Sequence, residues 1–314
     1  MVLLWSIILL FIGLGLLGVS GEKSVKYAQR LSKLFGLNTL FIGFVLLAVS
    51  TGIPELAIVI SSIWNGTPAL SVGDLIGSNF ADVSLVLGLV IVMGRGLPVA
   101  KSDYHSVVAI WLINCLLMGS VFWCGELTSW HGGVLVVTYF LSLAYLWRKR
   151  HGKAMTYGNT KVTRNAKWFT ILKLVLSLIF VFVASQLCVF SAIQIVKATG
   201  FDYVVIGATI FALGTSLPEV ILNVNAARQG DFGMAIGNSF GSVLEQGAFL
   251  LGLLALFSPT PLNINAVRGI APFMFGTYAL AGYGIIARRR IPLGAGWAML
   301  LLYVIYLVWN YFLL

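Results

Sequence analysis

The sequence predicts an all-α polytopic membrane protein with ten transmembrane helices in two inverted five-helix repeats and broken helices at the bilayer midplane. The first observation behind this fold class is composition: 59% of the 314 residues are hydrophobic and 10% are charged. The mean hydropathy of +0.98 lies far above that of soluble domains. The second is an internal repeat, in which residues 39–93 recur at 203–257 with a constant offset of 164. The third is the spacing of the apolar runs.

At about 20 apolar residues per span, the runs divide into ten segments. The predicted spans are 2–20, 37–64, 70–93, 104–124, 130–147, 169–190, 202–227, 233–257, 268–287 and 292–313. Because each repeat then has an odd number of spans, the two halves enter the membrane in opposite directions. We expect residues 1–147 to form the first repeat, 148–168 a basic cytoplasmic linker, and 169–314 the second repeat.

The basic residues predict the orientation. Eighteen of the twenty Lys and Arg residues fall on one side of this layout, and Lys197 and Arg268 fall on the other. The positive-inside rule then places both termini outside and the 148–168 segment in the cytoplasm. Because topology accounts for the net charge of +10, that charge does not indicate nucleic-acid binding. The run from Val2 to Val19 lacks a basic leader and a cleavage site, so we expect a first membrane helix there.

The Gly, Pro, Ser and Glu residues that interrupt the apolar runs recur at equivalent positions of the two repeats. Residues 164 apart include Pro54/Pro218, Glu55/Glu219, Gly66/Gly230, Gly73/Gly237, Gly77/Gly241, Ser78/Ser242 and Gly88/Gly252. A repeat of hydrophobic segments broken at corresponding Gly and Pro positions is typical of the binding site of a secondary transporter.

Half of the ten acidic residues lie inside predicted spans, where no Lys or Arg accompanies them. These are Glu55, Asp74, Asp82, Glu219 and Glu245. An Asp at a helix centre costs about 2.5–3.5 kcal/mol on insertion scales, so such residues indicate a functional site. Carboxylates with hydroxyls and backbone carbonyls are the oxygen ligands of Ca²⁺ and, by extension, Na⁺. The absence of nearby His or Cys argues against zinc, copper or iron.

Two of these acids follow predicted helix breaks. Ser216 and Glu219 have the spacing of a capping box with Pro218 in the first turn, so we expect a half-helix to begin at Ser216. Gly52 and Glu55 repeat the pattern with Gly as a weaker cap. The breaks should free carbonyls around Ala48, Val49, Ala212 and Leu213 for a cation. The alternative is that each Glu only completes a helix cap.

The third and eighth spans each carry a polar face. Asp74, Ser78 and Asp82 are four residues apart and share one face of a helix. Asn238, Ser242 and Gln246 occupy the same face of the eighth span. The neighbouring glycines allow close approach of backbones.

These motifs resemble the two alpha-repeats of the sodium/calcium exchangers in the cation/calcium antiporter superfamily, whose signature is close to GTSxPE followed by GNxxGSN. The second repeat carries GTSLPE at 214–219 and then Gly237, Asn238, Gly241 and Ser242. The first carries Thr51, Pro54, Glu55, Gly73, Gly77, Ser78 and Asn79. The resemblance implies exchange of Ca²⁺ against Na⁺ by alternating access, with the first and sixth helices sliding against the other eight.

The chain departs from the family pattern at several positions. The resemblance would place Asn at Asp74, Ser at Gly52 and Asn at Val243, and Glu245 has only Ala81 as its counterpart in the first repeat. A missing hydroxyl at Gly52 removes an expected Na⁺ ligand. Extra acids can take up protons, because burial without a cation favours the neutral carboxylic acid. Both changes weaken sodium coupling more than Ca²⁺ binding.

We therefore expect a cation antiporter that is not an enzyme and has no cofactor, with inorganic cations and the lipid bilayer as its partners. The expected ligands are Glu55 and Glu219, with Thr51, Thr215, Ser216, Ser78, Ser242 and Asp82, and with Asp74, Asn79, Asn238, Glu245 and Gln246 as further candidates. A Ca²⁺ or other divalent cation/H⁺ exchanger is the first alternative and a cation channel the second. An intramembrane enzyme is disfavoured because the spans lack a catalytic motif. We expect a prokaryotic inner membrane, and the chain is compatible with a monomer.

Overall fold

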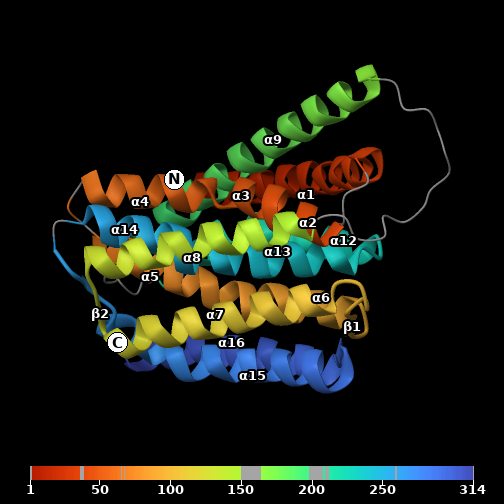
Figure 1. Ribbon diagram of the computed structural model, residues 1–314. Helices are drawn as coiled ribbons and strands as arrows, with labels where there is room; N and C mark the ends of the chain where they lie inside the picture. Colours follow the sequence, from red (N-terminus) through yellow and green to blue (C-terminus); the bar gives the residue numbers. More distant parts are fainter. Residues whose placement is uncertain are drawn as a thin grey trace.

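The computed structural model describes residues 2–35, 39–64, 66, 68–149, 164–197, 208, 212–258 and 260–313. The helices run nearly side by side in one bundle, crossed obliquely by two long outer helices (Figure 1). The first half contains α1 (Val2–Phe35), α2 (Thr39–Ile42), η1 (Gly43–Leu47), α3 (Ala48–Thr51), α4 (Ile53–Trp64), α5 (Pro68–Ala81), η2 (Asp82–Val86), α6 (Leu87–Met93), β1 (Leu97–Pro98), α7 (Tyr104–Cys124), β2 (Glu126–Leu127) and α8 (Ser129–Arg148).

The second half contains α9 (Arg164–Lys197), α11 (Ala212–Thr215), α12 (Leu217–Arg228), α13 (Phe232–Leu244), η4 (Glu245–Leu250), α14 (Leu251–Phe257), β3 (Leu262–Asn263), η5 (Asn265–Ile270), α15 (Ala271–Arg288), β4 (Arg290–Ile291) and α16 (Leu293–Leu313). Here η1, η2 and η4 are π-helical turns and η5 is a 3₁₀ helix. The predicted all-helical membrane fold is confirmed.

Eight helices in the described ranges are long and apolar enough to cross a membrane. They correspond to all the predicted spans except the second and the seventh. The second is interrupted at Gly52, between α3 and α4. The first part of the seventh, together with residues 150–163 of the predicted linker, lies outside the described residues. The count of ten spans and the domain division therefore stay predictions.

The predicted end of the first span at residue 20 is wrong, because α1 continues to Phe35. Apolar composition ends near Val19, but an amphipathic pattern continues, with Ser24, Val25, Ala28 and Leu31 buried and charged residues between them. The basic residues from Lys23 to Lys33 therefore belong to a helix and not to a loop.

Two short β-ladders show that the repeats are inverted. Leu97 of β1 pairs with Ile291 of β4, and Glu126 of β2 pairs with Asn263 of β3. β4 lies 164 residues after β2, so the two ladders are equivalent under the repeat. β1 and β2 nevertheless lie at opposite ends of the bundle (Figure 1). The repeat thus turns one half of the molecule end over end relative to the other.

The centre of the bundle is formed by the two helices that carry the polar faces. The segments Pro68–Met93 and Phe232–Phe257 are 83% and 78% buried, against 22–44% for the other described candidate spans. Glycines bring the halves together: a Cβ added at Gly77 would lie 2.8 Å from the Cβ of Ala212, and one added at Gly241 would lie 2.8 Å from that of Ala48. These equivalent contacts hold the broken helices against the core.

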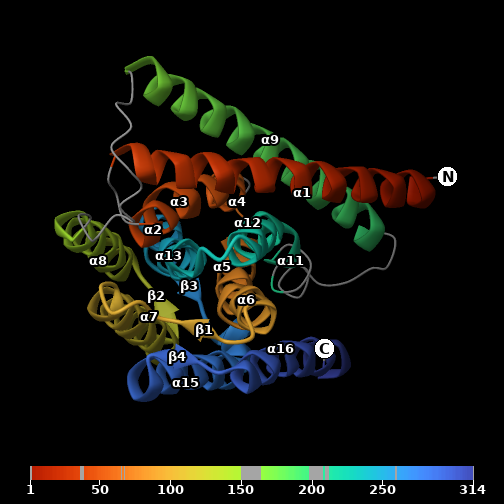
Figure 2. The ribbon, with the colours of Figure 1, turned by 90° about the vertical axis from the view of Figure 1, so that its right-hand side faces the viewer.

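The helices α1 and α9 form an outer pair on one side of the bundle, opposite α15 and α16 (Figure 2). Within the pair, Ser24 on α1 donates a buried hydrogen bond of 2.9 Å to Ser177 on α9. Their outward surfaces are apolar, as Phe11 and Phe180 show with exposed fractions of 70% and 63%. This composition suits contact with lipid tails.

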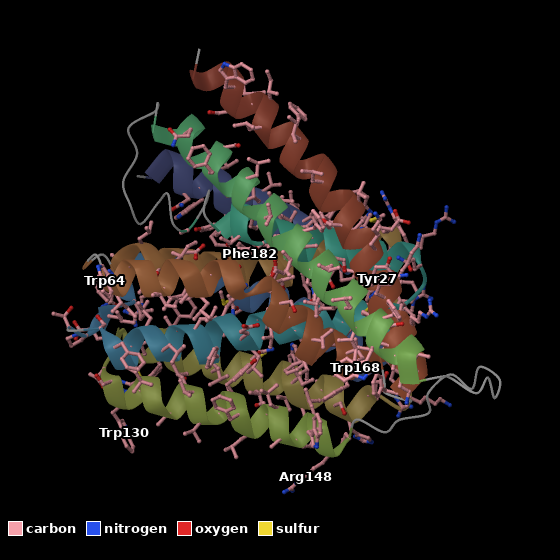
Figure 3. All side chains as sticks on the ribbon, turned by 90° about the horizontal axis from the view of Figure 1, so that it is seen from above. Tyr27, Trp64, Trp130, Arg148, Trp168 and Phe182 are labelled. Atoms are coloured by element: carbon pink, nitrogen blue, oxygen red, sulfur yellow. The ribbon has the colours of Figure 1, made fainter. Side chains whose placement is uncertain are left out.

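Exposed tryptophans lie toward both ends of the molecule. Trp64 and Trp130 lie at one end, and Trp168 lies toward the other, where Arg148 is also found (Figure 3). All three tryptophans are at least 62% exposed. This distribution is typical of the aromatic belts at the two membrane surfaces.

Candidate cation-binding site

The two broken helices place equivalent residues in equivalent conformations. Gly52 and Ser216 have φ/ψ of −75°/−2° and −77°/0°, and a new helix begins directly after each. Pro54 and Pro218 have no N–H, so the carbonyls of Ser50 and Gly214 lose their usual helical donor. The predicted free carbonyls at Ala48 and Ala212 are wrong, because each accepts from the N–H four residues later, at 2.9 and 3.1 Å.

The predicted capping box is also wrong. Ser216 occupies the N-cap position of α12, but its hydroxyl makes no cap hydrogen bond. Its Oγ and both carboxylate oxygens of Glu219 are buried without a partner in the described structure. By contrast, Asp231 caps α13 in the usual way and accepts from the N–H of Met234 at 3.1 Å. Glu219 therefore does more than complete a helix end.

Glu55 and Glu219 are both fully buried, at 0% exposed. None of their four carboxylate oxygens has a hydrogen-bond partner among the described residues. A buried charge without a partner costs several kcal/mol, and native structures keep very few such groups. The two glutamates are therefore the first candidates for a binding site in the described structure.

The five acids inside the predicted spans form one electrostatic group, in which Asp74 and Asp82 also act on Glu55. The charge of Glu219 acts on the four other buried carboxylates, which are Glu55, Asp74, Asp82 and Glu245. The one ion pair within the described ranges joins Lys26 and Glu22 of α1, both about half exposed. No basic side chain described here neutralises the buried acids.

The carboxylates do not form a metal cage by themselves. No three Asp, Glu, His or Cys side chains in the described part of the chain converge closely enough to hold an ion. A cation at this place needs hydroxyl, carbonyl or water oxygens in addition to the carboxylates. The required hydroxyls lie close by, on the broken helices and on the central helices.

The halves meet on a pseudo-twofold axis. Gln246 Nε2 donates to Asp82 Oδ2 at 2.9 Å, and Asn79 Nδ2 donates to the carbonyl of Val243 at 2.7 Å. Both bonds join residues 164 positions apart, so each position meets its own repeat partner. Asp82 Oδ1 and Gln246 Oε1 have no partner in the described residues and remain available as ligands.

The hydroxyls are used differently in the two halves. Thr215 donates to Asp74 Oδ1 at 3.2 Å and is hydrogen-bonded to Ser78 at 3.0 Å. Its repeat partner Thr51 donates back to its own helix, to the carbonyls of Leu47 and Ala48 at 3.2 and 3.0 Å. Asp74, Ser78 and Thr215 therefore form a linked network, whereas Thr51 bonds to its own helix and lies beside Glu219.

On the polar face of the eighth span, Gln246 bonds to Asp82, whereas the other two residues have no side-chain partner among the described residues. Asn238 and Ser242 are the repeat partners of Asp74 and Ser78, and their side-chain polar atoms are buried without hydrogen bonds in the described structure. Asn79, in contrast, uses both polar atoms of its amide: Nδ2 donates to the carbonyl of Val243, and Oδ1 accepts from the hydroxyl of Tyr278 at 3.3 Å. Some of the expected ligands thus have polar atoms without a hydrogen bond in the described structure, whereas others already bond to protein groups.

Known proteins are similar to this chain along most of its length. The family model described as sodium/calcium exchanger protein matches residues 5–148 and again 169–312. The chain belongs to the sodium/calcium exchanger family. It is 27% identical to the sodium/calcium exchanger MaX1 of Methanosarcina acetivorans, with 96% of this chain and 97% of that protein covered. It is 28% identical to the inner membrane protein YrbG of Escherichia coli, with 81% of each covered.

A solved structure is also similar along nearly the whole chain. The sodium-calcium exchanger NCX_Mj superposes with a TM-score of 0.82 at 26% identity, covering 98% of this chain and 99% of the other. The inverted helical architecture is therefore that of the sodium/calcium exchanger family.

Three buried polar residues of the same helices as the candidate site or of helices that contact them were not identified from the sequence. Asn223 lies one turn after Glu219 on α12 and is fully buried, with both side-chain polar atoms unpartnered in the described structure. Asn114 donates to the carbonyl of Phe240 at 3.3 Å, and its repeat partner 164 residues later is Tyr278. Asn223 could have been found from its position four residues after Glu219. Asn114 and Tyr278 could have been found because they are polar residues at equivalent positions of two apolar spans.

Proposed function

We propose that this chain is a secondary active antiporter that exchanges Ca²⁺ against Na⁺ by alternating access. The observation that carries the proposal is the pair Glu55 and Glu219, which the repeat relates and which are buried with four unpartnered oxygens. Two carboxylates neutralise one Ca²⁺, and the same oxygens can instead hold monovalent cations. Competition for one site couples the two fluxes without covalent chemistry.

The proposed ligands are the two glutamates with the free polar atoms around them. Ser216, Ser242, Asn238, Asp74, Asp82 and Gln246 each present at least one polar side-chain atom that is buried without a partner in the described structure. Thr51, Thr215, Ser78 and Asn79 already bond to protein groups and would support or complete the site. Hard oxygen ligands of this kind suit Ca²⁺ and Na⁺.

Uptake of radioactive Ca²⁺ into proteoliposomes tests the proposal. An outward Na⁺ gradient should drive uptake, and Glu55→Gln or Glu219→Gln should abolish it. Glu126→Gln, which removes an exposed acid in β2, serves as the matched control and should transport normally. Absence of Na⁺-driven uptake in the unmodified protein would refute sodium coupling.

Exchange of Ca²⁺ or another divalent cation against H⁺ is the second candidate. It is favoured by one position, Gly52, which has no hydroxyl and instead faces the carboxylate of Glu245. Uptake that follows a pH gradient and ignores Na⁺ would establish this coupling on the same fold. A flux that saturates and requires a counter-ion would separate either exchanger from a channel.

A further inference from the structure

Gly52 and Glu245 occupy one space. A Cβ added at Gly52 would lie 2.5 Å from Oε1 and 2.9 Å from Oε2 of Glu245, closer than real Cβ atoms approach other atoms. Glu245 itself is only 4% exposed, and its Oε2 has no hydrogen-bond partner in the described part of the chain. The carboxylate of Glu245 therefore fills the place that a side chain at position 52 would take.

The repeat-related positions have the opposite arrangement of residues. The repeat partners of Gly52 and Glu245 are Ser216 and Ala81. In the second half the broken helix supplies an oxygen, Ser216 Oγ, which is buried and unpartnered within the described structure. In the first half the broken helix supplies none. The two repeat-related pairs, Gly52 with Glu245 and Ser216 with Ala81, thus each contain one residue with a free side-chain oxygen, but from opposite members of the pair.

We propose that Glu245 is a cation ligand that replaces the side-chain oxygen absent at Gly52, so that the two residues form a subsite between the halves that differs from its repeat-related counterpart, Ser216 with Ala81. The inference rests on the proposed exchange function and assigns a specificity-determining role to Glu245. A carboxylate brings a full negative charge where a serine brings a dipole, so this subsite holds Na⁺ more tightly than a hydroxyl would.

Four variants test the assignment: Glu245→Gln, Glu245→Ala, Gly52→Ser, and the double variant Gly52→Ser/Glu245→Ala. The double variant gives positions 52 and 245 the same residues as their repeat partners, Ser216 and Ala81. Two quantities are measured: the Na⁺ concentration for half-maximal Ca²⁺ exchange, and the melting temperature of the purified protein in NaCl, CaCl₂ or choline chloride. Glu126→Gln is again the matched control for loss of one acid.

Glu245→Gln keeps the shape and removes the charge, so it should raise the half-maximal Na⁺ concentration by about tenfold and reduce the stabilisation by NaCl. Gly52→Ser should do the same, because it displaces the end of the Glu245 side chain. The double variant should return to within about threefold of the unmodified protein. A packing role for Glu245 would leave Glu245→Gln unchanged in both measurements, and that result would overturn the inference.

A double variant as impaired as Glu245→Ala alone would also overturn it, because an oxygen restored at position 52 would then not replace Glu245. Failure of the exchange function is a separate result. If the unmodified protein shows no cation-driven flux, the melting temperatures still decide: Na⁺ stabilisation that Glu245→Gln removes supports the subsite, whereas an unmodified protein that responds to neither cation refutes it.

Discussion

At the scale of single residues, the pair Asp82 and Gln246 shows how the repeat builds an asymmetric site. The two positions are 164 residues apart and are joined by a hydrogen bond of 2.9 Å from Gln246 to Asp82. A carboxylate and a primary amide have nearly the same planar shape, although the Gln side chain is one methylene longer than that of Asp. Because the pair lies on the pseudo-twofold axis, either helix can supply either member.

We predict that exchanging the two residues preserves transport. The double variant Asp82→Gln/Gln246→Asp keeps the hydrogen bond and the net charge, so Na⁺-driven Ca²⁺ uptake should stay within about threefold of the unmodified rate. Asp82→Gln alone removes one charge from the site, and Gln246→Asp alone places two acids in contact, so each should reduce uptake by about tenfold or more. A double variant no more active than either single variant would contradict the pseudo-symmetric role.

The buried acids of the candidate site could be picked out from the sequence, but their contacts could not. Glu55, Glu219 and the other acids stand out because charged groups inside apolar spans are costly. The contact between Gly52 and Glu245, and the bond between Tyr278 and Asn79, join helices whose relative placement no local pattern encodes. The capping prediction at Ser216 failed because it considered only local hydrogen bonds and not the needs of a ligand.

At the scale of elements, glycines let the broken helices approach the two central helices. A Cβ added at Gly77 would lie 2.7 Å from the carbonyl oxygen of Ala208, and one at Gly241 would lie 2.8 Å from that of Phe44. Backbone atoms cannot relieve a steric clash by rotating away, as the end of a flexible side chain can. The close contact between α5 and α11, and its counterpart between α13 and the second span, therefore depends on these two glycines.

We predict that Gly77→Ala and Gly241→Ala each destabilise the protein by about 1–3 kcal/mol through overpacking. Gly119→Ala, on α7, is the matched control, because nothing lies within 4 Å of its added Cβ. That change should be neutral or should stabilise the helix by about 0.5–1 kcal/mol. Melting temperatures of the detergent-solubilised proteins measure the difference, and equal values for all three variants would contradict the packing argument.

Helix boundaries were predictable where apolar composition changes sharply. The predicted span 104–124 coincides with α7 (Tyr104–Cys124). The end of α1 was missed because an amphipathic extension carries the helix past the apolar run. The π-helical turns at η2 and η4 were also missed, since the sequence there reads as ordinary helix and the wider turn is set by tertiary packing.

At the scale of the whole molecule, the outer pair α1 and α9 lies across one side of the bundle (Figure 2). At one crossing, a Cβ added at Gly21 of α1 would lie 3.6 Å from the Cβ of Ile221 on α12. That separation suits a disulfide bond. The contact offers a direct way to fix the outer pair to the core.

We predict that a Gly21→Cys/Ile221→Cys disulfide, in a background with Cys115, Cys124 and Cys188 replaced by Ala, abolishes exchange when oxidised and that reduction restores it. The reason is that alternating access would require α1 and α9 to slide past α12. The control Ser24→Cys/Ser177→Cys joins α1 to α9 at the position of their 2.9 Å hydrogen bond. It should leave exchange intact, and normal flux in the oxidised first variant would argue against sliding.

The axis contacts also bear on the ancestry of the molecule. If two identical chains once assembled in opposite orientations, residue 82 of one would have faced residue 82 of the other, as an acid against an acid or an amide against an amide. Joining both copies in one gene permits the mixed pair seen between Asp82 and Gln246. After such a fusion, the two residues that meet on the axis can differ from each other. A substitution at one of these positions then changes the charge of the site by one unit, whereas in a pair of identical chains it would change the charge by two.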